Sequence, residues 1–151
     1  EIGSDTLHTF TINDNDNPRT ASVALTSGSG DEAATPVSIE VVLSDAHPSK
    51  DLKVAYRATG GTATGSGTDY TLVPDTLTFP AGTTNGFLNV SIHDDALDEF
   101  DETVRVELVG TGSLNLNLGS DVVHTHTILD NDDPPELQFA ESGSSGAESF
   151  Q

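Results

Sequence analysis

Hydrophobic and polar residues alternate over several short segments of the chain. Val37, Ile39, Val41 and Leu43 are each separated by one other residue. A period of two places one face of a β-strand on a core and the other face in water. The same period recurs in four further segments, at residues 54–56, 77–79, 88–92 and 104–108.

Turn-forming residues separate these segments. Gly- and Asp-rich stretches such as 59–67 and 80–86 follow the strands at the spacing of β-hairpins. No stretch has the period of a long amphipathic helix. The pattern therefore predicts an all-β fold, a seven-stranded antiparallel immunoglobulin-like β-sandwich. Because the chain has no Cys, Met or Trp and is only 34% hydrophobic, we expect a thin core of Val, Leu, Ile, Phe and Ala.

An internal repeat organises the chain. Residues 8–18 resemble residues 124–134, with an offset of 116 residues from His8 to His124. Self-similarity at a fixed distance is typical of tandem arrays. We therefore expect the last strand and linker of a preceding repeat (1–18), one whole repeat (19–133) and the first strand of a following repeat (134–151).

The two end segments would then lack the strands with which they pair. Each carries apolar positions, such as Phe10 and Ile12 in the first and Leu137 and Phe139 in the second. Unpaired strands offer free backbone groups to other chains. We expect both segments either to be disordered or to pair with a neighbouring molecule.

The charge balance of the chain limits the classes of partner that it is expected to bind. The chain has 25 Asp and Glu against 5 Lys and Arg, and a formal net charge of -20. Nucleic acid and direct membrane insertion are disfavoured, since few cations are present to meet phosphate and no long apolar run exists. A multivalent cation is the natural complement, although acidity alone also keeps proteins soluble in salty habitats. The absence of Cys excludes disulfides, thiolate ligands and a Cys nucleophile.

The positions of the acids favour a bound cation over a solvated surface. Six carboxylates lie between Asp94 and Glu102, in a loop between two predicted strands. Asp69 lies in another loop, and further acids flank strands at 31–32 and 130–133. Several of these acids can meet at one end of an antiparallel sandwich. Ca²⁺ takes six to eight oxygen ligands in flexible geometry, whereas Mg²⁺ keeps more of its water and zinc prefers His or Cys.

Four motifs resemble a known family. They are the Gly-Thr-Ala…Gly-x-Asp-Tyr-like loop at 61–70, the strand and turn at 77–82, the acidic loop at 92–102 and the closing strand with its acidic tail at 127–132. In this order they resemble the Calx-beta domain, from about residue 32 to residue 132. The Asp-Asn-Asp-Asn-Pro run at 14–18 also resembles a cadherin linker. The loop motifs are not cadherin features, so Calx-beta is favoured.

The resemblance implies a seven-stranded sandwich that binds Ca²⁺ with carboxylates at one end. Asn131 stands where many members of the family have Asp, which implies fewer bound ions or one weaker site. Asp98 and Asp101 are expected to face solvent. The ligands that the resemblance implies are Glu32, Asp69, Asp94, Asp95, Glu99, Glu102, Asp130 and Asp132.

The function expected from these observations is a calcium-binding structural or adhesion repeat. Its partners would be neighbouring repeats and a cell-surface or matrix protein or glycan, and its location extracellular or at the cell surface. The alternative is a calcium-dependent module that recognises a carbohydrate or protein. We expect no enzyme, because carboxylate pairs are common in so acidic a chain, Trp is absent and no Gly-x-Ser-x-Gly motif occurs. His124 and His126 share a strand face in a spacing that could suit zinc, but we expect them to face the core.

Overall fold

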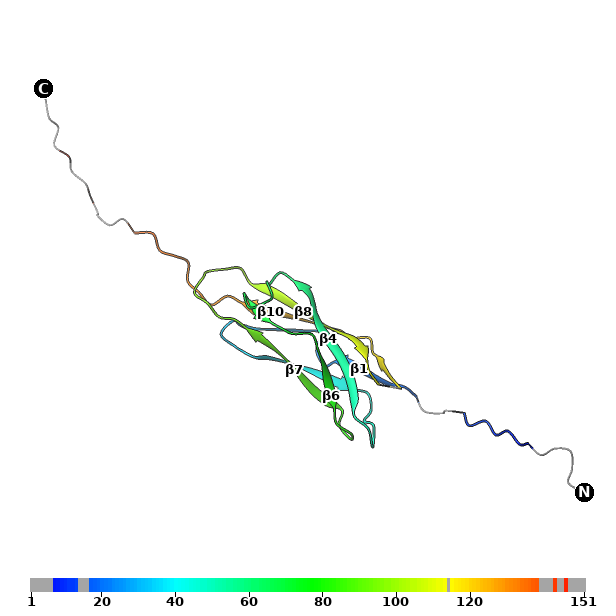
Figure 1. The fold of residues 1–151 in the computed structure, drawn as a ribbon. Helices are drawn as coiled ribbons and strands as arrows, with labels where there is room; N and C mark the ends of the chain where they lie inside the picture. Colours follow the sequence, from blue (N-terminus) through cyan, green and yellow to red (C-terminus); the bar gives the residue numbers. More distant parts are fainter. Residues whose placement is uncertain (1–6, 14–16, 114, 139–142, 144–145, 147–151) are drawn as a thin grey trace, which may run out of the picture.

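The structure, a computed structural model, describes residues 7–13, 17–113, 115–138, 143 and 146, and these contain ten β-strands (Figure 1). None of the described residues forms a helix long and apolar enough to cross a membrane. The strands are β1 (Arg19–Val23), β2 (Ser27–Asp31), β3 (Val37–Leu43), β4 (Leu52–Gly61), β5 (Tyr70–Thr71), β6 (Asp75–Phe79), β7 (Asn85–Ile92), β8 (Glu102–Thr111), β9 (Leu116–Leu118) and β10 (Val123–Leu129).

The strands form two five-stranded sheets, in the orders β5-β7-β3-β1-β9 and β2-β10-β8-β4-β6. The predicted β-sandwich is confirmed. The count of seven is approximate, because the first strand is split between the sheets as β1 and β2, and β5 and β9 are short additions. Two edge pairs, β1 with β9 and β2 with β10, are parallel, so the antiparallel description holds for the other pairs only.

The core is built from the aliphatic faces that the period-two pattern predicts. In β3 and β7 every second residue is buried, as in Ile39 and Val41 or Leu88 and Val90. Burial of these side chains stabilises the fold by about 1.5–3 kcal/mol each. The largest fully buried side chains are Phe79, Leu88, Leu108, Val41, Val54, Val90, Val104 and Val106.

The turns predicted at 59–67 and 80–86 differ from the structure in part. In addition Ser27-Gly28-Ser29-Gly30, which lacks the period-two pattern, forms most of β2. The stretch 80–84 joins β6 to β7, which lie in different sheets, so it is a crossover and not a hairpin. Gly60 and Gly61 end β4 at a register shift opposite β8 and have φ of 131° and 120°. A Cβ on Gly61 would lie 2.0 Å from the Thr103 carbonyl oxygen, so glycine is required there.

His124 and His126 face the interior, as expected. They are 6% and 5% exposed, and their rings stack with centroids 6.2 Å apart. His124 Nδ1 lies 2.7 Å from the Leu25 carbonyl oxygen, and both rings lie over the glycines of β2. Burial lowers the pKa of His126, and the charge of His124 adds to this effect. The pair fills the space that Gly28 and Gly30 of β2 leave without side chains.

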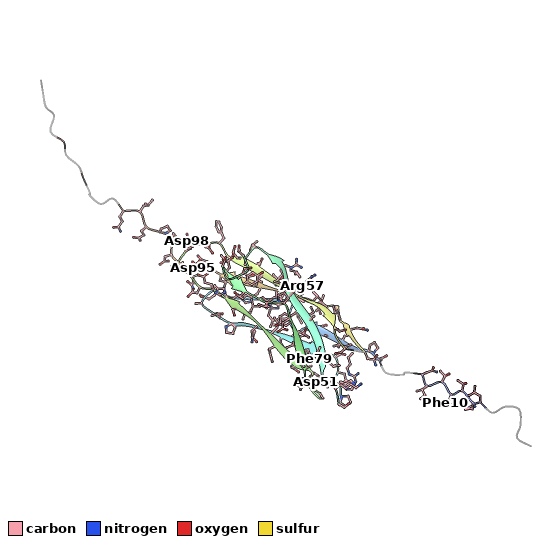
Figure 2. All side chains as sticks on the ribbon, viewed as in Figure 1. Phe10, Asp51, Arg57, Phe79, Asp95 and Asp98 are labelled. Atoms are coloured by element: carbon pink, nitrogen blue, oxygen red, sulfur yellow. The ribbon has the colours of Figure 1, made fainter. Side chains whose placement is uncertain are left out.

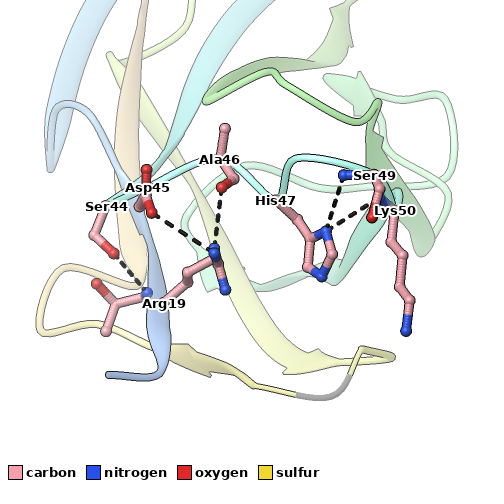
Figure 3. Close-up of polar contacts among 8 residues, drawn as sticks. Arg19, Ser44, Asp45, Ala46, His47, Ser49 and Lys50 are labelled. Atoms are coloured by element: carbon pink, nitrogen blue, oxygen red, sulfur yellow. Dashed lines mark hydrogen bonds and ion pairs between the residues drawn. The ribbon is translucent and has the colours of Figure 1, made fainter. Parts of the chain in front are cut away.

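The two ends of the sandwich differ, and the chain enters at one and leaves at the other (Figure 1). Asp51 lies at the entry end and Asp95 and Asp98 at the exit end (Figure 2). At the entry end, Arg19 Nε donates to the Ala46 carbonyl oxygen at 3.2 Å, and Arg19 also pairs with Asp45 at 3.7 Å (Figure 3). Arg19 therefore offsets the charge of one carboxylate at this end, that of Asp45.

The end segments contain no strand in their described parts. Phe10, Ile12 and Leu137 are 78%, 85% and 102% exposed. Phe139 and residues 1–6 and 14–16 lie outside the described residues. The division into parts of three repeats, and pairing of these segments with another molecule, stay predictions.

Candidate metal centre

Four chain segments meet at the exit end of the sandwich. They are the residues after β2, the loop 62–69 between β4 and β5, the loop 93–101 between β7 and β8, and the residues after β10. Residues that are a hundred positions apart in sequence thereby come together, as the hydrogen bond from Asn131 to Asp31 shows. Six of the eight predicted ligands fall into two groups of three.

The first group, here called the buried cluster, consists of Glu32, Asp130 and Asp132. One carboxylate oxygen of each lies within 4.8 Å of the others. Glu32 is only 8% exposed. Its backbone N–H donates to the Leu129 carbonyl oxygen at 3.1 Å, which fixes it beside the end of β10.

The buried cluster holds uncompensated negative charge. Among the described residues, the buried side-chain oxygens without a hydrogen-bond partner are Glu32 Oε1, Asp130 Oδ1 and Asp132 Oδ2. Burial raises the pKa of Glu32 from 4.5 to about 7. The neighbouring charges of Asp130, Asp132 and Asp94 add to that rise in pKa. A buried oxygen without a donor is costly, so this arrangement calls for a cation.

The second group, here called the loop cluster, consists of Asp69, Glu99 and Glu102, with oxygens again within 4.8 Å of one another. Burial raises the pKa of Glu102 from 4.5 to about 7, and its contact with Asp69 contributes next. Desolvation also raises the pKa of Glu99, ahead of the charges of Asp69, Asp95 and Asp130. Because the charge of Asp130 contributes to the raised pKa of Glu99, the two clusters interact electrostatically.

Backbone contacts position the loop cluster. Thr103 N–H donates to Thr62 Oγ1 at 2.8 Å, and Thr62 N–H donates to Thr103 Oγ1 at 3.2 Å, so the loop 62–69 is tied to the start of β8 beside Glu102. Thr64 N–H donates to the Asp69 carboxylate. Gly65 lies against the ring of buried Tyr70, where a Cβ would be 3.2 Å from Cζ. The Gly-rich motif thus serves to bring Asp69 to Glu102.

The remaining predicted ligands lie beside the clusters. Asp94 accepts a hydrogen bond from Asn131 Nδ2 at 3.0 Å and acts on Glu32 through its charge. Asp95 Oδ1 accepts the Leu97 N–H at 2.8 Å, which shapes the acidic loop. Neither belongs to the two groups of three.

Sequence reasoning missed two positioning acids. Asp101 is exposed as expected, but its carboxylate also accepts the Asp130 N–H at 3.3 Å. Asp31 accepts hydrogen bonds from the Ala33 N–H at 3.0 Å and from Asn131 Nδ2 at 2.9 Å. Its place next to Glu32 in the sequence was the one available signal.

The donor set fits a hard cation. Both clusters offer carboxylate oxygens from several loops, which is the ligand type that Ca²⁺ prefers. The salt bridges among the described residues, Arg19–Asp45 and Arg57–Glu107, lie away from these acids. No described cationic side chain within ion-pair distance therefore offsets the charge of either cluster.

Comparisons with known proteins decide the family. The sequence model of the Calx-beta domain matches residues 14–134. The chain belongs to the Calx-beta family. The resemblance that the sequence motifs indicated is thereby confirmed. The comparison with curated proteins finds no match.

Solved structures support the assignment. The apo form of the Calx CBD1 domain is 25% identical, with a TM-score of 0.68 over 76% of this chain and 98% of that chain. The calcium binding domain CBD12 of CALX1.1 is 26% identical, with a TM-score of 0.67 over 74% of this chain and 44% of that chain. This Calx-beta chain thus spans less than half of that longer protein. The Calx CBD2 domain, 13% identical with a TM-score of 0.61, shows the fold alone.

Proposed function

We propose that this Calx-beta domain binds Ca²⁺ between the loops at its exit end. One observation carries the proposal, namely that the unpartnered buried oxygens of the described residues all belong to Glu32, Asp130 and Asp132. Like charges in one site oppose mutual ionisation unless a counter-charge is bound. The similarity to a protein whose title names it a calcium binding domain supports the same choice of ion.

Each cluster would hold an ion in its own way. Glu32 and Asp130 lie directly after strands, with Asp132 two residues further on, and would need little rearrangement. Asp69 and Glu102 are similarly fixed, whereas Glu99 belongs to the loop 93–101 and would order on binding. Bound Ca²⁺ would supply positive charge that offsets the repulsion among these carboxylates. We propose Asp94 and Asp95 as outer ligands that complete the coordination of the two clusters.

The wider role proposed is that of a structural or adhesion repeat, not an enzyme, in a tandem array at the cell surface or outside the cell. Entry and exit of the chain at opposite ends of the sandwich support a linear array (Figure 1). The repeated motif at 8–18 and 124–134 supports it too. An ion at the exit end would lie where the next repeat begins, and would so restrict the angle between neighbours.

The experiment is a thermal melt of chelator-stripped protein, titrated in parallel with Ca²⁺ and Mg²⁺. A ligand that binds only the folded state stabilises it by about 2.7 kcal/mol at a hundredfold excess over Kd, which corresponds to a rise in Tm of about 10 °C for a domain of this size. We expect that rise with Ca²⁺ and a much smaller one with Mg²⁺. A Tm indifferent to both ions would refute the proposal. Asp121→Asn, which removes an exposed acid before β10, is the matched control and should respond like the wild type.

A second candidate function, calcium-dependent recognition of a carbohydrate or protein, would use another surface. Leu25 and Phe87 are 70% and 56% exposed and border a hollow with Ser38 and Glu40. An exposed aromatic ring beside polar groups is the feature that favours recognition. Binding of a glycan array or a matrix protein that is lost in Phe87→Ala, with the calcium-induced rise in Tm unchanged, would support this function over a pure spacer.

A further inference from the structure

Asn131 connects two acids that come from different loops. Its Nδ2 donates to Asp31 Oδ1 at 2.9 Å and to Asp94 Oδ1 at 3.0 Å. Asp31 ends β2, and Asp94 follows β7 in the opposite sheet. The amide thus bridges the two sheets at the rim of the buried cluster, between Asp130 and Asp132 in sequence.

The chemistry of this bridge resembles that of a bound cation. An amide –NH₂ group has two N–H donors, and here each carboxylate receives one of them. An Asp at position 131 would have no donor and would add a third negative charge beside Asp31 and Asp94.

We infer that Asn131 is a positioning residue that takes the place of a cation between Asp31 and Asp94, and so limits the calcium ions bound at this end to those of the two clusters. The inference about ion number rests on the proposed function, but the bridge itself does not. The sequence motif recurs, because Asn15 stands between Asp14 and Asp16 at the same offset of 116 residues. Both copies of the motif therefore have Asn at this position.

The test compares Asn131→Asp and Asn131→Ala with the wild type, first in chelator and then in Ca²⁺. In chelator, Asn131→Ala should lower Tm by about 3 °C through the lost hydrogen bonds, and Asn131→Asp by about 6 °C through the added repulsion. In Ca²⁺, titration calorimetry should show one more ion per protein for Asn131→Asp and no additional ion for Asn131→Ala. Asn117→Asp, an exposed acid added on β9, is the control for charge alone and should change neither quantity.

The two readouts separate the possible failures. If both variants melt like the wild type in chelator, the bridge is refuted, whatever the wild type binds. If Asn131→Asp binds the same number of ions as the wild type, the limit on ion number is refuted. If neither the wild type nor the two variants bind Ca²⁺, while both variants melt lower than the wild type in chelator, the proposed function is refuted and the bridge is supported.

Discussion

The buried cluster and the loop cluster use the same ligand chemistry in different settings. Each brings three carboxylates within 4.8 Å of one another at the same end of the sandwich. Only the buried cluster contains buried oxygens without a hydrogen-bond partner among the described residues. In the loop cluster, by contrast, Glu99 is exposed and Asp69 accepts a backbone N–H. The loop cluster can therefore reduce the repulsion among its carboxylates without a bound ion.

The elements that carry the ligands explain this difference. Glu32 directly follows β2, and Asp130 follows β10, with β2 and β10 joined by a five-residue parallel ladder. The backbones of these two residues cannot separate unless the ladder opens. Glu99 lies within the loop 93–101 and can swing into water at the cost of little structure. We therefore expect the buried cluster to bind more tightly, because its ligands are already held together.

The largest expected effect follows from removing the buried charge with Glu32→Gln. Without Ca²⁺, the variant should melt several degrees above the wild type, because the repulsion with Asp130 and Asp132 is reduced. With Ca²⁺, its affinity should fall at least tenfold, or about 1.4 kcal/mol, because a charged ligand is lost. Thermal melts in chelator together with calorimetric titration measure both effects.

The opposite signs of these two effects make the test specific. A substitution that merely damages the fold would lower Tm in chelator as well as in Ca²⁺. Glu136→Gln, which alters an exposed acid beyond β10, should leave both measurements unchanged. Full calcium affinity in Glu32→Gln would show that the buried cluster is not the tighter site.

A smaller effect is expected from pH in the protein without Ca²⁺. Glu32 and Glu102 each have a folded-state pKa of about 7, raised from 4.5. Protonation therefore favours the folded state, and this stabilisation is complete below pH 4.5 and is lost as pH rises through 7. In chelator, Tm should rise by several degrees between about pH 8 and about pH 5, after the smaller opposing effect of His126, whose lowered pKa costs stability as pH falls. The pKa of Asp31 is lowered from 3.8, so its titration affects stability only at a pH below this range.

The same pH series distinguishes the clusters. Glu32→Gln and Glu102→Gln should each remove a large part of the pH dependence, since each deletes one of the two carboxyl groups whose pKa is raised to about 7. Ca²⁺ must displace the protons, so its affinity should fall as pH is lowered through 7. A Tm in chelator that is flat or falls toward pH 5 would contradict the shared desolvation of the two glutamates.

Much of the fold could be predicted because period-two burial is a local signal. Strands such as β3 and β7 carry it in full, and their inward residues are the buried ones. β2 has no such signal, since Ser27 to Gly30 reads as a turn on propensity alone. The strand exists because β10 offers a partner and because His124 and His126 need the space that Gly28 and Gly30 leave. That requirement belongs to the tertiary structure and cannot be predicted from the segment itself.

The candidate site, too, could be predicted from the sequence only in part, because its geometry depends on the tertiary structure. The family motifs pointed to eight acids, and the structure brings six of them into the two clusters. Which acids group together depends on the pairing of β2 with β10 and on the Thr62–Thr103 contacts, none of which the sequence pattern contains. Asn131 was noted only as a missing Asp. Its donation to Asp31 and Asp94 depends on where three separate segments meet.

The smallest expected effect comes from Glu99→Gln. Glu99 is the exposed member of the loop cluster, so the carboxylate is replaced where water can already screen it. We expect a loss of calcium affinity of about two- to threefold and a Tm in chelator within about 1 °C of the wild type. Calorimetric titration beside Glu32→Gln measures the contrast directly. Equal losses for Glu99→Gln and Glu32→Gln would mean that the two clusters act as one site, and that burial of Glu32 confers no advantage in affinity.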